Sequence, residues 1–169
     1  QYPDTTNTAR ALMNLALCYQ QQTNPLLVKA TALQLAERFP AHPRAPIMLL
    51  TISKVYSERQ DLEMLDWVYG VFLDNFPQNE KAPAVLLSLA VIRNKKKDKA
   101  GAEQFLQRLI QDHPADPAAL KAREQIAWLR YNEGNYDQAI EYFQAFLAKT
   151  TDEALKPTAQ FGLADSFIR

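Results

Sequence analysis

The chain has 169 residues, of which 47% are hydrophobic and 22% charged, a composition typical of one globular domain. Its 19 basic and 19 acidic residues give a formal net charge of zero, which argues against nucleic acid as a partner because nucleic-acid-binding surfaces carry excess positive charge. Four glycines and the lack of alternating Val/Ile/Thr-rich runs favour helices over strands.

The chain carries few signs of its compartment. A single cysteine, Cys18, excludes an intrachain disulfide framework. No apolar run reaches the ~18 residues of a membrane span, so we expect no direct membrane insertion, and no signal peptide is visible. Because the sequence begins at Gln1 and stops at Arg169 inside an apolar helical pattern, we expect a fragment of a longer protein.

Two markers recur every 37 residues along the sequence. The first is an aromatic residue or histidine followed by proline: Tyr2-Pro3, Phe39-Pro40, Phe76-Pro77 and His113-Pro114. The second is a polar residue that follows a short polar run: Asn24, Asp61, Asp98 and Asn135. A fixed period of roughly 20–50 residues indicates a repeat protein, in which each unit buries its apolar face against its neighbours. The predicted repeats are 2–38, 39–75, 76–112, 113–149 and a partial fifth, 150–169, within one domain, 1–169.

Apolar spacing predicts two helices in each repeat, joined by a tight turn. In chain order the expected pairs are 9–22 with 26–38, 47–57 with 62–75, 84–93 with 99–112, and 118–132 with 136–148. The segment 151–169 reads as the first helix of a fifth repeat without its partner. In the fourth repeat Asp116 is placed to cap the first helix, and Gly134 suits a left-handed position at its end.

The fourth repeat resembles the tetratricopeptide repeat, on Ile126-Ala127, Gly134, Tyr136, Ala139 and Phe143. In that family small residues let the two helices approach closely, and an aromatic residue fills the space between repeats. The resemblance implies an all-α right-handed solenoid of antiparallel helix pairs, with about four and a half repeats here. The first two repeats depart from the pattern, with Leu65 in the small-residue position of the second.

The period of 37, longer than the usual 34 of the family, also resembles bacterial envelope proteins. Repeats of outer-membrane assembly lipoproteins and Tol-Pal-associated periplasmic proteins share the aromatic-Pro connection and the Ala-Pro that follows it, here Ala45-Pro46 and Ala82-Pro83. This likeness implies a periplasmic or membrane-associated location in a bacterium. A cytoplasmic location is the alternative.

No catalytic constellation is visible, so we expect no enzyme activity, no cofactor and no metal. His42 and His113 lie in connections between repeats, without a cysteine or carboxylate at metal-ligand spacing. Cys18 shares its repeat position with apolar residues, which predicts a buried, inert thiol. The lysine-rich turn 94–99 is interpreted as a solvated turn, with a basic binding patch as the alternative.

The resemblance also predicts the binding surface, because the first helix of each repeat lines the concave face of such solenoids. We call the corresponding positions the binding row: Met13, Leu17, Ile47, Leu50, Lys54, Leu87, Val91, Lys121, Glu124, Trp128 and Tyr131. Its apolar members and its aromatic pair suit a peptide or amphipathic helix of a partner protein. We therefore expect a protein-interaction scaffold that is one module of an envelope or secretion-related protein. The alternative is an architectural spacer or capping segment with no ligand on this face. The incomplete last repeat predicts self-association through that end.

Overall fold

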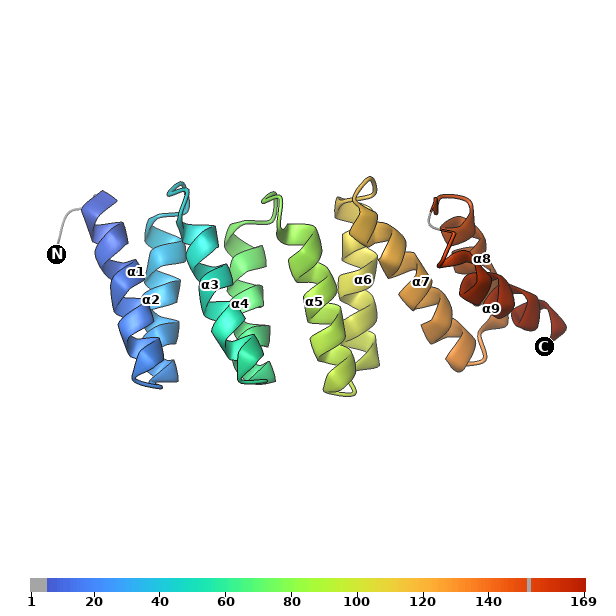
Figure 1. Cartoon of the computed structure of the whole chain (residues 1–169), viewed down its shortest axis with the longest axis horizontal. Helices are drawn as coiled ribbons and strands as arrows, with labels where there is room; N and C mark the ends of the chain where they lie inside the picture. Colours follow the sequence, from blue (N-terminus) through green and yellow to red (C-terminus); the bar gives the residue numbers. More distant parts are fainter. Residues whose placement is uncertain (1–5, 152) are drawn as a thin grey trace. The chain divides into compact units, whose positions relative to one another are not determined.

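The computed structural model describes residues 6–151 and 153–169, so the Tyr2-Pro3 marker lies outside the described residues. The described part contains nine α-helices and no strand (Figure 1). They are α1 (Thr6–Gln21), α2 (Pro25–Arg38), α3 (Ala45–Glu58), α4 (Leu62–Asn75), α5 (Ala82–Lys95), α6 (Lys99–Asp112), α7 (Pro117–Asn132), α8 (Tyr136–Leu147) and α9 (Lys156–Ile168). The predicted all-α fold of repeated helix pairs is confirmed.

The chain divides into two compact units, Gln1–Val85 and Leu86–Arg169, and the division falls within α5. In the first unit α1 pairs with α2 and α3 pairs with α4, and α2 also packs against both helices of the second pair. Its core contains fully buried Leu35, Leu49, Ile52 and Phe72. Burial of such aliphatic and aromatic side chains is the main stabilising contribution in a fold of this kind.

The second unit is built around α7, which packs against α6, α8 and α9. Its core joins small residues, Ala127, Ala139 and Ala159, to the rings of Phe143 and Phe146. The alanines let the helices approach closely, and the rings fill the remaining space. The predicted contact role of Ala139 therefore agrees with its complete burial.

Four turns share a left-handed residue at 37-residue intervals: Thr23, Gln60, Lys97 and Gly134, with φ of 54°, 56°, 62° and 79°. Sequence analysis identified only Gly134, because the other three are not glycine. This conformation costs L-residues roughly 1–2 kcal/mol. All four repeats thus adopt the same turn geometry, although only the fourth has a glycine at this position.

The recurring polar marker is the N-cap of each second helix. The carboxylate or amide oxygens of Asn24, Asp61 and Asp98 accept hydrogen bonds from the backbone N–H three residues later, at 3.2, 3.0 and 2.9 Å. Such caps satisfy backbone donors that the first turn of a helix leaves free. Asn135 is also at the N-cap but makes no side-chain capping bond.

The aromatic-Pro marker is a C-cap with one backbone conformation. Phe39, Phe76 and His113 have φ of −130°, −132° and −132°, and each N–H donates to the carbonyl four residues earlier. His113 thus occupies the same structural position as the two phenylalanines, as predicted. Three residues further on, side chains of His42, Asn79 and Asp116 accept a hydrogen bond from the N–H two residues later, at 3.2, 3.0 and 2.8 Å.

Several helix boundaries differ from the prediction. Helices α2 and α7 begin at prolines, and α3 and α5 have proline in their first turn, where its missing N–H costs nothing. The predicted start of the last helix at residue 151 is wrong, because α9 begins at Lys156, immediately before Pro157.

Cys18 is exposed, so the prediction of a buried thiol is wrong. Its helix, α1, contacts α2 and α3, and the thiol lies on the part of the helix surface that these neighbours leave open. The equivalent Ile92 is buried within α5, so the same repeat position has different surroundings in different repeats.

Candidate functional site

A pocket of about 540 Å³ opens in the second unit between the end of α5, the start of α6 and α7. Its lining residues are Val91, Asn94, Lys95, Lys99, Gln125, Trp128, Leu129 and Asn132. Two of them, Val91 and Trp128, belong to the predicted binding row. Three lining side chains are apolar, and the other five carry amide or ammonium groups.

The α5 wall of the pocket consists of Val91, Asn94 and Lys95. They are three and four residues apart, so they share one face of the helix. Val91 is 41% exposed, a large exposed fraction for an aliphatic side chain within a helix. This wall therefore presents apolar surface to solvent beside a charged group.

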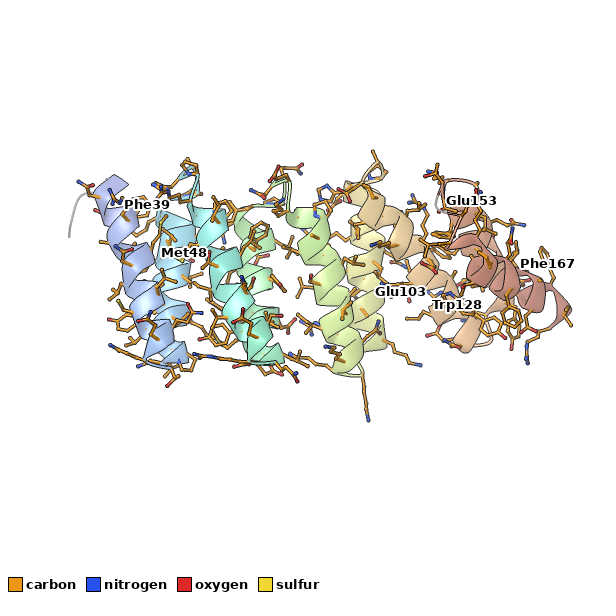
Figure 2. The ribbon with its side chains drawn as sticks, in the orientation of Figure 1. Phe39, Met48, Glu103, Trp128, Glu153 and Phe167 are labelled. Carbon is orange, nitrogen blue, oxygen red and sulfur yellow. The ribbon has the colours of Figure 1, made fainter. Side chains whose placement is uncertain are left out.

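The α7 wall consists of Gln125, Trp128, Leu129 and Asn132, again on one helical face. Trp128 meets the ring of Phe143 edge-on at 5.0 Å and that of Tyr131 at 5.5 Å. It also lies close to α9, since a Cβ atom on Gly162 would stand 2.9 Å from its Cη2 atom. Trp128 (Figure 2) thus joins α7 to the two helices that follow while its half-buried ring still lines the pocket.

The remaining row residues of the second unit have mixed surroundings. Tyr131 packs edge-on against Tyr136 at 5.7 Å. Leu87 is half-buried and Lys121 exposed. Burial raises the pKa of the Glu124 carboxyl, and the positive charge of Lys121 partly offsets that rise.

In the first unit the row residues range from buried to open. Met13 is only 6% exposed and belongs to the core, whereas Ile47 is 59% exposed. Leu17 and Leu50 are half-buried, and Lys54 is exposed. None of these five residues lines the pocket of the second unit, and their use in binding stays a prediction.

A hydrogen-bond cluster fastens α9 to α7. The Tyr131 hydroxyl donates to Asp165 Oδ2, and Arg169 Nε donates to the same oxygen at 2.9 Å. The bonds from Tyr131 and Arg169 hold the pKa of Asp165 below its ordinary value, because they favour the ionised carboxylate. The bond to Asp165 correspondingly raises the pKa of Tyr131.

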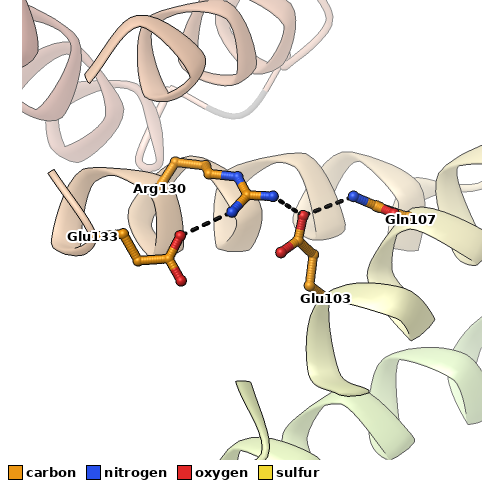
Figure 3. A network of polar contacts seen from close by, with 4 residues as sticks. All are labelled: Glu103, Gln107, Arg130 and Glu133. Carbon is orange, nitrogen blue, oxygen red and sulfur yellow. Dashed lines mark hydrogen bonds and ion pairs between the residues drawn. The ribbon is translucent and has the colours of Figure 1, made fainter. Parts of the chain in front are cut away.

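A second polar network orients α7 from the α6 side (Figure 3). Arg130 donates to Glu103 and also to Glu133, the latter at 2.8 Å. Glu103 accepts a further hydrogen bond from Gln107 at 2.7 Å. This largely buried ion pair fixes the rotation of α7, and so helps to decide which side chains its wall presents to the pocket.

The binding row omits six of the eight lining residues: Asn94, Lys95, Lys99, Gln125, Leu129 and Asn132. The two lysines were interpreted as part of a solvated turn. Gln125 and Asn132 lie three and four residues from Trp128 on α7, and Leu129 lies four residues from Gln125. Helical periodicity could therefore have identified all three.

Two other pockets lie away from the predicted row. One, of about 640 Å³, lies between the start of α8 and the end of α9 and includes Tyr136, Asp137 and Arg169. The other, of about 360 Å³, lies in the first unit beside Arg10 and the segment 42–44. Across residues 6–151 and 153–169 we find no group of three His, Cys, Asp or Glu side chains that could hold a metal ion. No helix in this part of the chain has both the length and the apolar character that crossing a membrane requires.

Comparison with known proteins assigns the repeat type. Residues 84–116 and residues 125–169 each match a family model described as tetratricopeptide repeat. These two segments carry tetratricopeptide repeats. Together they contain the whole pocket, from Val91 to Asn132. Tetratricopeptide repeats generally mediate contacts between proteins, and proteins that contain them are typically scaffolds rather than enzymes.

Solved structures with similar folds cover nearly all of the chain. The crystal structure of MamA protein has a TM-score of 0.59 at 15% identity, covering 97% of this chain and 83% of that one. TPR-like repeats of a protein from Podosopora anserina have a TM-score of 0.56 at 17% identity, covering 99% of this chain and 88% of that one. Similarity at this level shows the fold alone. No curated protein matches the chain, and the narrower resemblance to envelope proteins finds no support among the matches.

Proposed function

We propose that the chain is a protein-interaction scaffold in which the pocket between α5 and α7 receives an apolar side chain from a peptide or helix of the partner. The observation that carries the proposal is the exposure of Val91, 41%, in a pocket that Trp128 also lines. An exposed aliphatic side chain and an aromatic ring that line one pocket are typical of the anchor site of an interface. The polar groups that line the pocket can also fix the orientation of a bound chain.

The amide side chains support a polypeptide as the ligand. Asn94, Gln125 and Asn132 line the pocket, and amides can both donate to and accept from a peptide backbone. Such groups suit the alternating N–H and C=O groups of an extended segment, or the free groups at a helix end.

The proposed setting is the periplasm or membrane surface of a bacterium, within a larger envelope or secretion-related protein. Its support is the 37-residue period with its aromatic-Pro and Ala-Pro connections. Fractionation of cells that express the parent protein tests this setting. Recovery in the cytoplasmic fraction alone would contradict it.

A peptide library tests the proposed pocket without knowledge of the natural partner. Random twelve-residue peptides displayed on phage are selected for binding to the 169-residue chain. The enriched peptides are then tested for binding to the Val91→Asp variant. We expect the enriched peptides to share a large apolar residue and to lose binding to Val91→Asp. Gln104→Asp, an equal charge change at an exposed site on α6, is the matched control and should retain binding. Enrichment that survives Val91→Asp would contradict the proposed site, and no enrichment would favour the architectural alternative.

A second candidate function is self-association through α9. Its outer face exposes Phe161, Phe167 and Ile168, at 66%, 64% and 82% (Figure 2 labels Phe167), whereas Ala159 and Gly162 face the core. Apolar side chains gathered on one helix face are a usual sign of an interface. Sedimentation velocity should show concentration-dependent dimers that Phe161→Ser/Phe167→Ser abolishes. A monomer at all concentrations would contradict this.

A further inference from the structure

Within the proposed function, the structure also points to the chemistry of the partner. We propose that the partner segment carries a carboxylate next to its apolar anchor, and that Lys95 and Lys99 bind this carboxylate at the edge of the pocket. The inference rests on the proposed binding role of the pocket and adds a charge requirement to it. It changes the interpretation of the lysine-rich turn from a purely solvated segment to part of the site.

The charge of the pocket lining is one-sided. Lys95 and Lys99 are both exposed and both line the pocket, and none of the lining residues is acidic. Within the described residues neither lysine forms an ion pair. A binding surface of one sign favours a ligand of the opposite sign through both attraction and orientation.

Two other charged groups of the same turn, Arg93 and Asp98, are already engaged. Arg93 pairs with Asp98 at 3.3 Å and lies over the ring of Phe105 at 5.9 Å. Asp98 also accepts the capping hydrogen bond from the N–H of Gly101 at 2.9 Å. The one nearby carboxylate of the turn therefore serves the fold, which leaves the ammonium groups of Lys95 and Lys99 available for an external carboxylate.

Helix electrostatics do not explain Lys99. Lys95 lies in the last turn of α5, where a cation is stabilised by the helix dipole. Lys99 is the first residue of α6, where a cation opposes the dipole. Its position is unfavourable for the helix but suitable for a bound anion, because the amino end of α6 adds partial positive charge to that of the side chain.

The spacing of the groups predicts the spacing in the ligand. Val91 and Lys95 are one helical turn apart, with Cβ atoms about 5–6 Å from each other. In a bound helix the same distance separates residues three or four apart, and in an extended segment residues two apart lie about 6.6 Å from each other. Gln125 Oε1 is buried and has no hydrogen-bond partner within the described residues.

The same phage selection tests the charge requirement. Among the peptides that lose binding to Val91→Asp, we expect Asp or Glu to be enriched within four positions of the apolar anchor. For one such synthetic peptide, replacement of its acidic residue by the corresponding amide should weaken binding roughly tenfold at low salt, as expected for two partly exposed ion pairs. Fluorescence anisotropy of the labelled peptide measures the affinity.

A double-mutant cycle assigns the effect to the two lysines. The Lys95→Gln/Lys99→Gln variant should bind the acidic peptide with an affinity reduced by the same factor as the amide replacement causes. It should bind the amide peptide as tightly as the native chain does. Lys95→Arg/Lys99→Arg should retain binding, and Lys149→Gln, at an exposed site outside the pocket, is the charge control. Urea unfolding verifies that each variant is folded. The charge requirement is overturned if the selected peptides are neutral or basic, or if the lysine variants leave the affinity unchanged. Neither outcome contradicts the proposed binding of an apolar side chain in the pocket. Binding that is insensitive to Val91→Asp would instead overturn the proposed function itself.

Discussion

The α5 and α7 walls of the pocket differ in how far their side chains also pack within the fold. On α5, Val91 is 41% exposed. On α7, Trp128 has two aromatic neighbours, Phe143 at 5.0 Å and Tyr131 at 5.5 Å. Both residues were predicted as anchors from the same row of repeat positions. Equivalent positions in a repeat therefore differ in their availability, because α8 and α9 hold the α7 wall while the α5 wall faces solvent.

The largest expected effect follows from the structural role of Trp128. Trp128→Ala removes a ring that joins α7 to α8 and α9, and should lower the free energy of unfolding by about 3 kcal/mol. Val91→Ala should change it by no more than about 0.5 kcal/mol. Urea denaturation monitored by circular dichroism measures both. Equal losses of unfolding free energy in the two variants would show that the α5 and α7 walls contribute equally to stability.

Gly162→Ala tests how closely α9 approaches the aromatic residues. A Cβ atom there would stand 2.5 Å from Phe143 Cζ, so the substitution should destabilise the fold by about 1–3 kcal/mol. Helix propensity alone predicts the opposite sign, a gain of about 1 kcal/mol. Phe143→Leu should reduce the penalty when the two changes are combined. A more stable Gly162→Ala protein would contradict the described packing.

The left-handed turn positions allow a matched pair in the two units. Gln60→Gly relieves an unfavourable backbone conformation at φ 56° and should stabilise the chain by about 0.5–1 kcal/mol. Gly134→Ala, at φ 79°, should destabilise it by a similar amount. Thermal unfolding of the two variants measures the difference. The same sign for both would mean that these turns are not equivalent.

The smallest expected effect is the pH dependence of the bond between Tyr131 and Asp165. The depressed pKa of Asp165 contributes stability above the unfolded value of about 3.9, which is lost as the pH falls through the folded pKa. The raised pKa of Tyr131 contributes stability below about 10, which is lost as the pH rises through its folded value. The protection of the α9 amides from exchange, relative to their intrinsic exchange rates at each pH, should therefore be greatest between these limits. Tyr131→Phe should reduce the loss of α9 protection at both low and high pH. An unchanged pH profile would contradict a stabilising role for the bond between Tyr131 and Asp165.

Much of the fold could be predicted because each repeat contains residue types that mark helix ends and turns locally. Asp116 caps α7 and Gly134 adopts a left-handed conformation, as its residue type indicated. Thr23, Gln60 and Lys97 adopt the same conformation without a glycine to mark it, so only their 37-residue spacing could have revealed them.

The candidate site was less predictable because it depends on contacts between repeats. The tetratricopeptide resemblance placed Val91 and Trp128 in one row of repeat positions, and both side chains line one pocket. The sequence of one repeat carries no sign that Gly162, 34 positions after Trp128, would lie against its ring. Exposure of Cys18 likewise depends on which neighbours cover α1 rather than on its repeat position.

The most direct test of the central claim is a nuclear magnetic resonance titration of the chain with a selected acidic peptide. If the pocket binds the peptide, the largest amide shifts should fall on Val91, Asn94, Lys95, Lys99 and Asn132, with smaller changes on α9. Shifts concentrated on Phe161, Phe167 and Ile168 instead, with residues 91–99 unmoved, would place binding on α9 and contradict the account.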